Sequence, residues 1–401
     1  MNRTFLRPAP GSWRPRGLAI GLLLALLAGA LLASCGGGVG TGGTGSFGSA
    51  PVSGYGSIFV GGIEFDDSHA TVLDDDGVAL PPNGSALHLG TMTEVEGDAV
   101  MDSPTGPTAV ASTVRLARLV VGPVMAVDVS GRSVNVLGQT LQVNGSTVLD
   151  ASLRSGLAGL HVGDLVAAHA LADAAGRPVA TRIEPAASGD AWRIRGYVAG
   201  LNPSTKRFSV GAATLDFGAA AEVPPGLANG QYVHVKLASV PNGGVLTVSQ
   251  FVTASVAPAD AARVEIEGLV AALSSQGTFR IGALGVDASG ATVLPSPAAL
   301  VAGAHALIEG RLQANTLVAG KVTLLTAQQA DRRSYQLFGA VSALNVAGQT
   351  FVVRNVGVDY SAARFVNGTA ATLAAAGVSV HVQGTLSADG TLIQASQIRF
   401  P

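Results

Sequence analysis

The chain has 401 residues, of which 48% are hydrophobic, 12% are charged and 53 are glycine. This composition is too apolar for a disordered protein and too rich in glycine for a helical one, so it favours an all-β structure with many turns. Without four arginines in an N-terminal segment that we expect to be removed, 20 basic residues face 26 acidic ones. They form no basic cluster, which argues against a nucleic-acid partner.

The N-terminus has the features of a signal peptide. Arginines precede an apolar run from Leu18 to Leu32, which is too short for a comfortable bilayer span of about 20 residues. The run ends in Leu32-Ala33-Ser34-Cys35, which resembles the lipobox of bacterial lipoproteins. That resemblance implies that residues 1–34 are cleaved off and that Cys35 carries lipid, such as palmitate, that holds the protein on a membrane. A plain secretory signal or an uncleaved anchor is the alternative.

Two further predictions concern the residues around Cys35. By the sorting rule for such lipoproteins, Gly36 in place of aspartate implies the outer membrane. Residues 35–50 are rich in glycine and predict a flexible tether. Because Cys35 is the single cysteine, internal disulfides and sites with several thiolate ligands are excluded.

The rest of the chain repeats itself. Segments that begin Gly-x-Val recur at spacings of 74, 72 and 71 residues, and alternating apolar and polar residues follow each start. This alternation is typical of strands with one buried face. A second landmark glycine precedes another strongly alternating strand in each unit. The first landmark lies at Gly122, Gly196, Gly268 and Gly339, and the second at Gly90, Gly163, Gly230, Gly303 and Gly377.

Each unit predicts three strands, a short helix or loop, and two more strands. Leu157-Ala158-Gly159-Leu160 and Leu373-Ala374-Ala375-Ala376 are candidates for the helical turn. This order matches the five-stranded OB-type barrel, with a β-sandwich as the alternative. We therefore expect an all-β tandem array of about five OB-like modules after the signal peptide and tether. The predicted modules cover residues 51–120, 121–187, 191–257, 262–326 and 334–401.

Several motifs resemble one family. The opening SCGGGVGTGGTGSF, the entry Ser53-Gly54-Tyr55-Gly56-Ser57-Ile58 and the repeated Gly-x-Val units are similar to bacterial lipoproteins of the family named domain of unknown function 5666. The resemblance runs from the signal to the C-terminus and implies no catalytic or binding residues. Leu237 stands where Gly97, Gly310 and Gly384 end the fourth strand, which leaves that register open.

The densest acidic cluster is the candidate metal site. Asp74, Asp75 and Asp76 precede Gly77, and carboxylate oxygens are suitable ligands for Ca²⁺. An EF-type loop does not fit, because Val72 and a distal asparagine stand where that loop needs ligands. Asp-Gly is also common in hairpin turns, so a solvated turn is the simpler interpretation.

Other candidate residues carry weaker signals. His234 and His381 occupy matching positions in separate units, which indicates strand histidines facing solvent or a module seam. Trp192 is expected to anchor a module seam, and its neighbours Arg193, Arg195 and Tyr197 come closest to a ligand-binding face.

The sequence contains no G-x-S-x-G, H-E-x-x-H or phosphate-loop motif. We therefore expect no enzymatic activity and no cofactor. The predicted function is a structural or interaction scaffold of the cell envelope. The alternative is a glycan- or small-ligand-binding protein, with or without a dependence on Ca²⁺.

Overall fold

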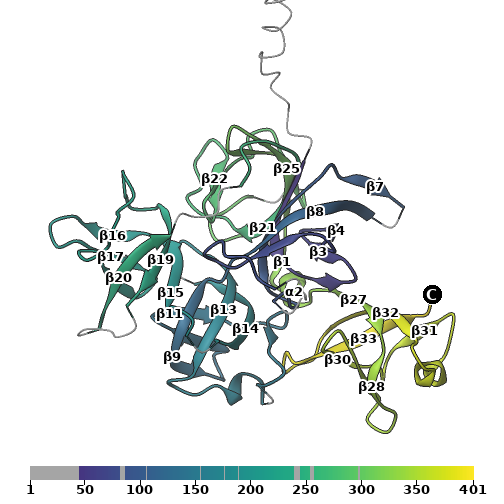
Figure 1. Ribbon diagram of the computed structural model, residues 1–401. Coiled ribbons are helices and arrows are strands. Elements are labelled where there is room, and N and C mark those ends of the chain that lie inside the picture. Colours follow the sequence, from purple (N-terminus) through teal and green to yellow (C-terminus); the bar gives the residue numbers. More distant parts are fainter. Residues whose placement is uncertain are drawn as a thin grey trace, which may run out of the picture. The chain divides into compact units, whose positions relative to one another are not determined.

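The computed structural model of the chain consists almost entirely of β-strands joined by turns (Figure 1). It describes residues 45–81, 86–104, 106–153, 155–175, 177–187, 189–238, 244–252, 257–296 and 299–401. The predicted signal peptide, Cys35 and most of the predicted tether lie outside these described residues. Within the described ranges, no helix is long and apolar enough to cross a membrane.

Five consecutive sets of strands occupy the described residues. The first set has β1 (Ser46–Pro51), β2 (Gly54–Tyr55), β3 (Ile58–Val60), β4 (Ile63–Asp66), β5 (Thr71–Leu73), β6 (Met92–Gly97), β7 (Met101–Ser103) and β8 (Gly106–Leu116). The second has β9 (Val120–Asp128), β10 (Ser133–Val136), β11 (Gln139–Gln142), β12 (Val148–Leu149), the 3₁₀ turn η1 (Gly156–Gly159), β13 (Leu165–Leu171) and β14 (Val179–Pro185). The third has β15 (Arg193–Tyr197), β16 (Ala199–Asn202), β17 (Arg207–Val210), β18 (Ala213–Asp216), β19 (Tyr232–Leu237) and β20 (Val245–Val252).

The last two sets follow the same plan. The fourth has β21 (Ala261–Leu269), β22 (Thr278–Ile281), β23 (Leu284–Asp287), β24 (Thr292–Leu294), β25 (His305–Gln313) and β26 (Thr316–Leu324), and the helix α2 (Ala327–Asp331) follows it. The fifth has β27 (Tyr335–Ala340), β28 (Ser342–Asn345), β29 (Thr350–Val353), β30 (Val356–Asp359), β31 (Arg364–Val366), the 3₁₀ turn η2 (Ala370–Ala374), β32 (Ser379–Leu386) and β33 (Leu392–Arg399). Both predicted helical turns overlap a 3₁₀ turn.

One pairing order recurs in every set. The first strand position pairs antiparallel with the second and the fourth, and the second pairs with the third. The fifth position pairs antiparallel with the fourth and parallel with the third. This order closes five strand positions into a barrel, so the predicted OB-like fold is confirmed over the β-sandwich. The exact module bounds stay predictions.

The landmark glycine before each fourth strand has a positive φ. The angle is +79° at Gly90, Gly230 and Gly303, +96° at Gly163 and +68° at Gly377. Glycine adopts this left-handed conformation without the penalty that a Cβ brings. The backbone N–H of Gly90 donates to the carbonyl of Val52 just after β1, and that of Gly163 donates to the carbonyl of Val124 in β9. The repeated glycine is therefore a requirement of the turn that closes each barrel.

A bulge also recurs inside the fourth strand. The register shifts at Gly97, Ala170, Leu237, Gly310 and Gly384 in the five sets. A Cβ at Gly310 would lie 2.3 Å from the carbonyl oxygen of Val318 across the strand pair. In the third module the same register shift occurs at Leu237. The register that the sequence left open is therefore the same there as in the modules with a glycine at this position.

The predicted tether extends too far along the chain, to residue 50. Residues 46–50 form β1, so the prediction that they belong to a flexible tether is wrong. Phe47 is 4% exposed and packs into the core of the fourth set. Gly48 lies against Phe65, where a Cβ would be 3.1 Å from the ring. Here the small residues allow close packing between two neighbouring strands, a role that composition alone cannot distinguish from flexibility.

The first strands join the modules to one another. Strand β1 pairs in parallel with β21, and β2 pairs in parallel with β27. Strand β9 pairs antiparallel with β15. Buried apolar side chains also unite the first set with the fifth and the second set with the third. The modules therefore share sheets and cores, and the first strands of several modules lie near one junction.

Candidate functional site

A turn in the first module carries the predicted metal ligands. Asp74 follows β5, and its Oδ1 accepts hydrogen bonds from the backbone N–H of Asp76 at 2.9 Å and of Val78 at 2.8 Å. Gly77 completes the turn with a φ of +79°. The Asp74 carboxylate thus shapes the turn, as short acidic side chains often do. The same turn buries Asp75, which is 3% exposed.

Asp75 lies among three arginines. Arg118 donates its backbone N–H to Oδ1 at 2.8 Å, and its Nε pairs with Oδ2. Arg195 donates from Nη2 to Oδ1 at 3.0 Å, and Arg193 Nη1 lies 3.6 Å from Oδ2. Burial raises the pKa of Asp75, but the three positive charges outweigh burial and hold that pKa well below its ordinary value.

The network extends from Asp75 to a second aspartate. Asp76 lies 3.3 Å from Arg193 Nη1 and 3.0 Å from the Nζ of Lys236. Arg193 is on β15 and Lys236 is on β19, so both cations come from the third module. They therefore fix the turn of the first module to the third barrel.

Asp190, in the linker between the second and third modules, also belongs to this network. It accepts a hydrogen bond from Arg118 Nη1 at 3.0 Å. Arg118 itself lies between the first and second modules. We call these seven residues the junction network: Asp75, Asp76, Arg118, Asp190, Arg193, Arg195 and Lys236.

This arrangement bears on the calcium hypothesis. Asp74 caps its own turn, Asp75 pairs with arginines, and Asp76 pairs with Arg193 and Lys236. Within the part of the chain that the structure describes, no group of three or more His, Cys, Asp or Glu side chains is placed to hold a metal ion. Cations of the protein itself occupy the positions around Asp75 and Asp76 that a bound calcium would need.

A second buried network joins the first and second modules. His169 on β13 is 1% exposed, and its Nδ1 accepts a hydrogen bond from the backbone N–H of Met92 at 3.2 Å. Its Nε2 lies 3.6 Å from Glu184, which also pairs with Arg182 at 2.5 Å. Burial lowers the pKa of His169. The neutral ring with a proton on Nε2 fits both contacts.

A third buried network joins the fourth module to the linker before the fifth. Glu267 on β21 accepts from Arg333 Nη1 at 2.9 Å and lies 2.8 Å from Nε2 of His305. Arg333 Nη2 also pairs with Glu267. Burial raises the pKa of Glu267, but Arg333 and His305 outweigh burial and lower it to about 2.

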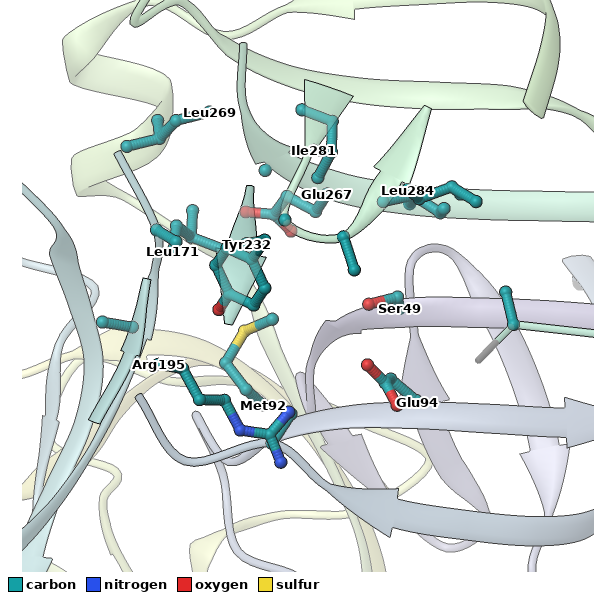
Figure 2. Close-up of a pocket in the computed structure, with 18 of the residues that line it drawn as sticks. Ser49, Met92, Glu94, Leu171, Arg195, Tyr232, Glu267, Leu269, Ile281 and Leu284 are labelled. Atoms are coloured by element: carbon teal, nitrogen blue, oxygen red, sulfur yellow. The ribbon is translucent and has the colours of Figure 1, made fainter. Parts of the chain in front are cut away.

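A cavity of about 280 Å³ lies beside the junction network. Residues from four modules line it, and Figure 2 shows Met92 and Glu94 of the first, Leu171 of the second, Arg195 and Tyr232 of the third and Glu267 of the fourth. Most other walls are apolar and include Leu269, Ile281 and Leu284.

Two polar groups distinguish one wall of this cavity. Arg195 is 5% exposed, and its Nε has no hydrogen-bond partner among the described residues. Tyr232 packs edge-on against Tyr197, with ring centres 5.1 Å apart, and burial raises the pKa of Tyr232 to about 12. Both groups are therefore hydrogen-bond donors at neutral pH.

The remaining candidates lie at seams rather than on an open face. Arg193, Arg195 and Tyr197 are buried, so they form no exposed binding surface. Trp192 packs partly buried against the core shared by the second and third modules, as expected of a seam anchor.

The two matching histidines differ in their surroundings. His234 is 2% exposed, and neither ring nitrogen has a hydrogen-bond partner among the described residues. Burial and the neighbouring Arg195 lower its pKa to about 2. His381 is half-buried and lies 3.1 Å from the side-chain oxygen of Gln336. His234 therefore does not face solvent, and the charge of Asp75 from the first module near its ring agrees with a module seam.

Sequence reasoning missed the partners of the acidic turn. Arg118, Asp190 and Lys236 are separate in sequence, and no local spacing links them to Asp75. The available signal was Arg193 and Arg195 on one face of an apolar strand, because buried arginines require paired anions.

Comparison with known proteins identifies one family whose model matches three segments of the chain. Residues 121–184, 267–323 and 338–399 match the family described as "Domain of unknown function (DUF5666)". No curated protein matches the chain. Among solved structures, the chain is similar to one described as "drosophila Unr CSD456", with 14% identity, a TM-score of 0.14, and coverage of 53% of this chain and 98% of that chain.

Proposed function

This chain belongs to the DUF5666 family through three of its segments, and we propose that it is a non-enzymatic interaction scaffold of the bacterial cell envelope. The lipobox-like sequence that ends at Cys35 supports a lipid anchor, and Gly36 supports the outer membrane as its destination. Two or more acyl chains hold a protein stably on a bilayer. The barrels would then present their surfaces to other envelope components.

The junction network carries this proposal. Asp75 of the first module binds arginines from the third module and from the first linker, and all of these contacts are largely buried. Removing one partner of a buried ion pair costs about 3–5 kcal/mol, so alternative arrangements of the modules are penalised. In some proteins, buried charge pairs specify one arrangement where apolar contacts would allow several. A fixed arrangement of several barrels is what a scaffold needs.

Cross-linking in native envelopes tests the scaffold. The lipidated protein is cross-linked in cells and purified, and its cross-linked bands are compared between wild type, Asp75→Asn and the control Asp102→Asn. Asp102 pairs with Arg263 but is exposed, so its loss should change nothing. We expect Asp75→Asn to lose discrete bands. Identical bands in all three proteins, or none in wild type, would contradict the scaffold.

Labelling with radioactive palmitate tests the anchor separately. Cys35→Ala removes the thiol that accepts the lipid. We expect this variant to accumulate as unlipidated precursor and to incorporate no radiolabelled palmitate. Cys35→Ser is the matched variant and should behave in the same way. Continued palmitate labelling of either variant would refute the lipid assignment.

A further inference from the structure

We propose that the cavity beside the junction network binds a small, largely apolar molecule through a carboxylate that accepts a hydrogen bond from Arg195. The site differs from the barrel surfaces that the scaffold would offer, and it does not depend on the scaffold role. Four modules build its walls, so the site exists only in the assembled array.

The size and lining of the cavity set the class of ligand. Its volume of about 280 Å³ is near the lower end of small-molecule sites, which run from about 300 to 1,000 Å³. Met92, Leu171, Leu269 and Ile281 make the walls mostly apolar. A glycan would leave many hydroxyls without partners against such walls, whereas an aliphatic or aromatic body would bury well.

Arg195 supplies the recognition group. Its Nη2 is engaged by Asp75 at 3.0 Å, but its buried Nε has no acceptor among the described residues. Buried donors without partners are rare, and hydrogen bonds to a charged guanidinium are stronger than neutral ones. A ligand carboxylate in the cavity would complete the hydrogen bonding of this side chain.

Charged side chains of both signs lie around the cavity, so the donor on Arg195, rather than the net charge, selects a carboxylate. In the junction network, four cations face three carboxylates, which leaves one positive charge in excess. Glu267 also lines the cavity, but Arg333 pairs with it on both oxygens. Glu94 lines the same cavity from β6 and brings a further negative charge to it. Its removal should therefore strengthen the binding of an anion.

Two probes of the same shape test the charge preference. The mature lipoprotein in lipid nanodiscs is titrated calorimetrically with 4-phenylbutyrate and with 4-phenylbutylamine, and empty nanodiscs serve as the blank. We expect the carboxylate to bind at least tenfold more tightly than the amine. Equal affinity, tighter binding of the amine, or no binding of either probe would overturn the proposal.

Substitutions then locate the bound carboxylate. Arg195→Lys keeps a positive charge near Asp75 but removes Nε, so we expect a tenfold to hundredfold loss of phenylbutyrate affinity. Arg207→Lys, in an exposed pair with Asp216, is the matched control and should bind as wild type does. Unchanged affinity in a folded Arg195→Lys protein would overturn the assignment.

Two further variants keep the test valid if Arg195→Lys does not fold. Ala172→Leu places extra carbon in the cavity from a partly exposed position and should abolish binding. Glu94→Gln should tighten phenylbutyrate binding several-fold. Binding that survives Ala172→Leu, or that weakens in Glu94→Gln, would contradict this site. Cross-linking of the scaffold does not require the ligand, so the two proposals can fail separately.

Discussion

Arg195 in the third module donates a hydrogen bond of 3.0 Å to the carboxylate of Asp75 in the first module, 120 residues earlier in the chain. Both side chains are buried, and Arg118 from the first linker binds the same carboxylate. One aspartate in a surface-like Asp-Asp-Asp-Gly turn therefore connects parts of the chain that the repeat pattern treats as independent.

Loss of the Asp75 charge should destabilise the array. Asp75→Asn leaves three buried or partly buried arginines without their shared anion, and we expect a loss of about 3–5 kcal/mol. At about 2–4 °C per kcal/mol for domains of 150–250 residues, the melting temperature should fall by roughly 10 °C. Differential scanning calorimetry measures the change. Asp102→Asn is the exposed control, and equal melting of the two variants would rule out a stabilising network.

Much of the architecture was predictable, because the strands follow from the alternation of apolar and polar residues within each repeat. Alternating strands and the landmark glycines, such as Gly230 and Gly303, gave the strand order of an OB-like barrel. The junction was not predictable in the same way. Asp75 and Arg195 belong to different repeats, and their pairing depends on how barrels dock, which no spacing within one repeat encodes. For the same reason composition places Phe47 in a tether, although its side chain packs into the core of the fourth module.

Acid should weaken the protein through Glu267. Its pKa is about 2 in the folded protein, below its ordinary value of 4.5, so its stabilisation is present above that ordinary value and is lost as the pH falls toward 2. The contribution is on the order of 3 kcal/mol. Denaturant midpoints between pH 6 and pH 3 should fall steeply in wild type and less steeply in Glu267→Gln. Parallel curves for the two proteins would contradict the ion pair with Arg333.

Two buried histidines should respond in opposite directions to the same substitution. His234 has no hydrogen-bond partner among the described residues for either nitrogen, so His234→Leu removes a desolvation cost and should stabilise the protein by about 1–3 kcal/mol. His169→Leu leaves the Met92 N–H without its acceptor and should destabilise by a similar amount. Thermal melting of both variants checks the contrast. Destabilisation by both would mean that His234 has a partner.

In the fourth module, the fourth-strand bulge should not tolerate a side chain at Gly310, although Ala170 and Leu237 occupy this position in two other modules. Gly310→Ala would place a Cβ 2.3 Å from the carbonyl oxygen of Val318, and we expect a loss of about 1–3 kcal/mol. Gly285→Ala is the matched control in the same module, because the Cβ of an alanine there would meet no neighbouring atom within 4 Å. Equilibrium unfolding compares them. Equal stability of the two variants would show that the bulge can relax.

The most direct test of a fixed arrangement of the modules is a double-mutant cycle between Asp75 and Arg195. Asp75→Asn, Arg195→Gln and the double variant are unfolded alongside wild type, and the coupling energy is taken from the four stabilities. We predict a coupling of at least about 1.5 kcal/mol, because the pair is buried and joins two modules. A coupling within about 0.5 kcal/mol of zero would mean that the first and third modules are not held together by this pair.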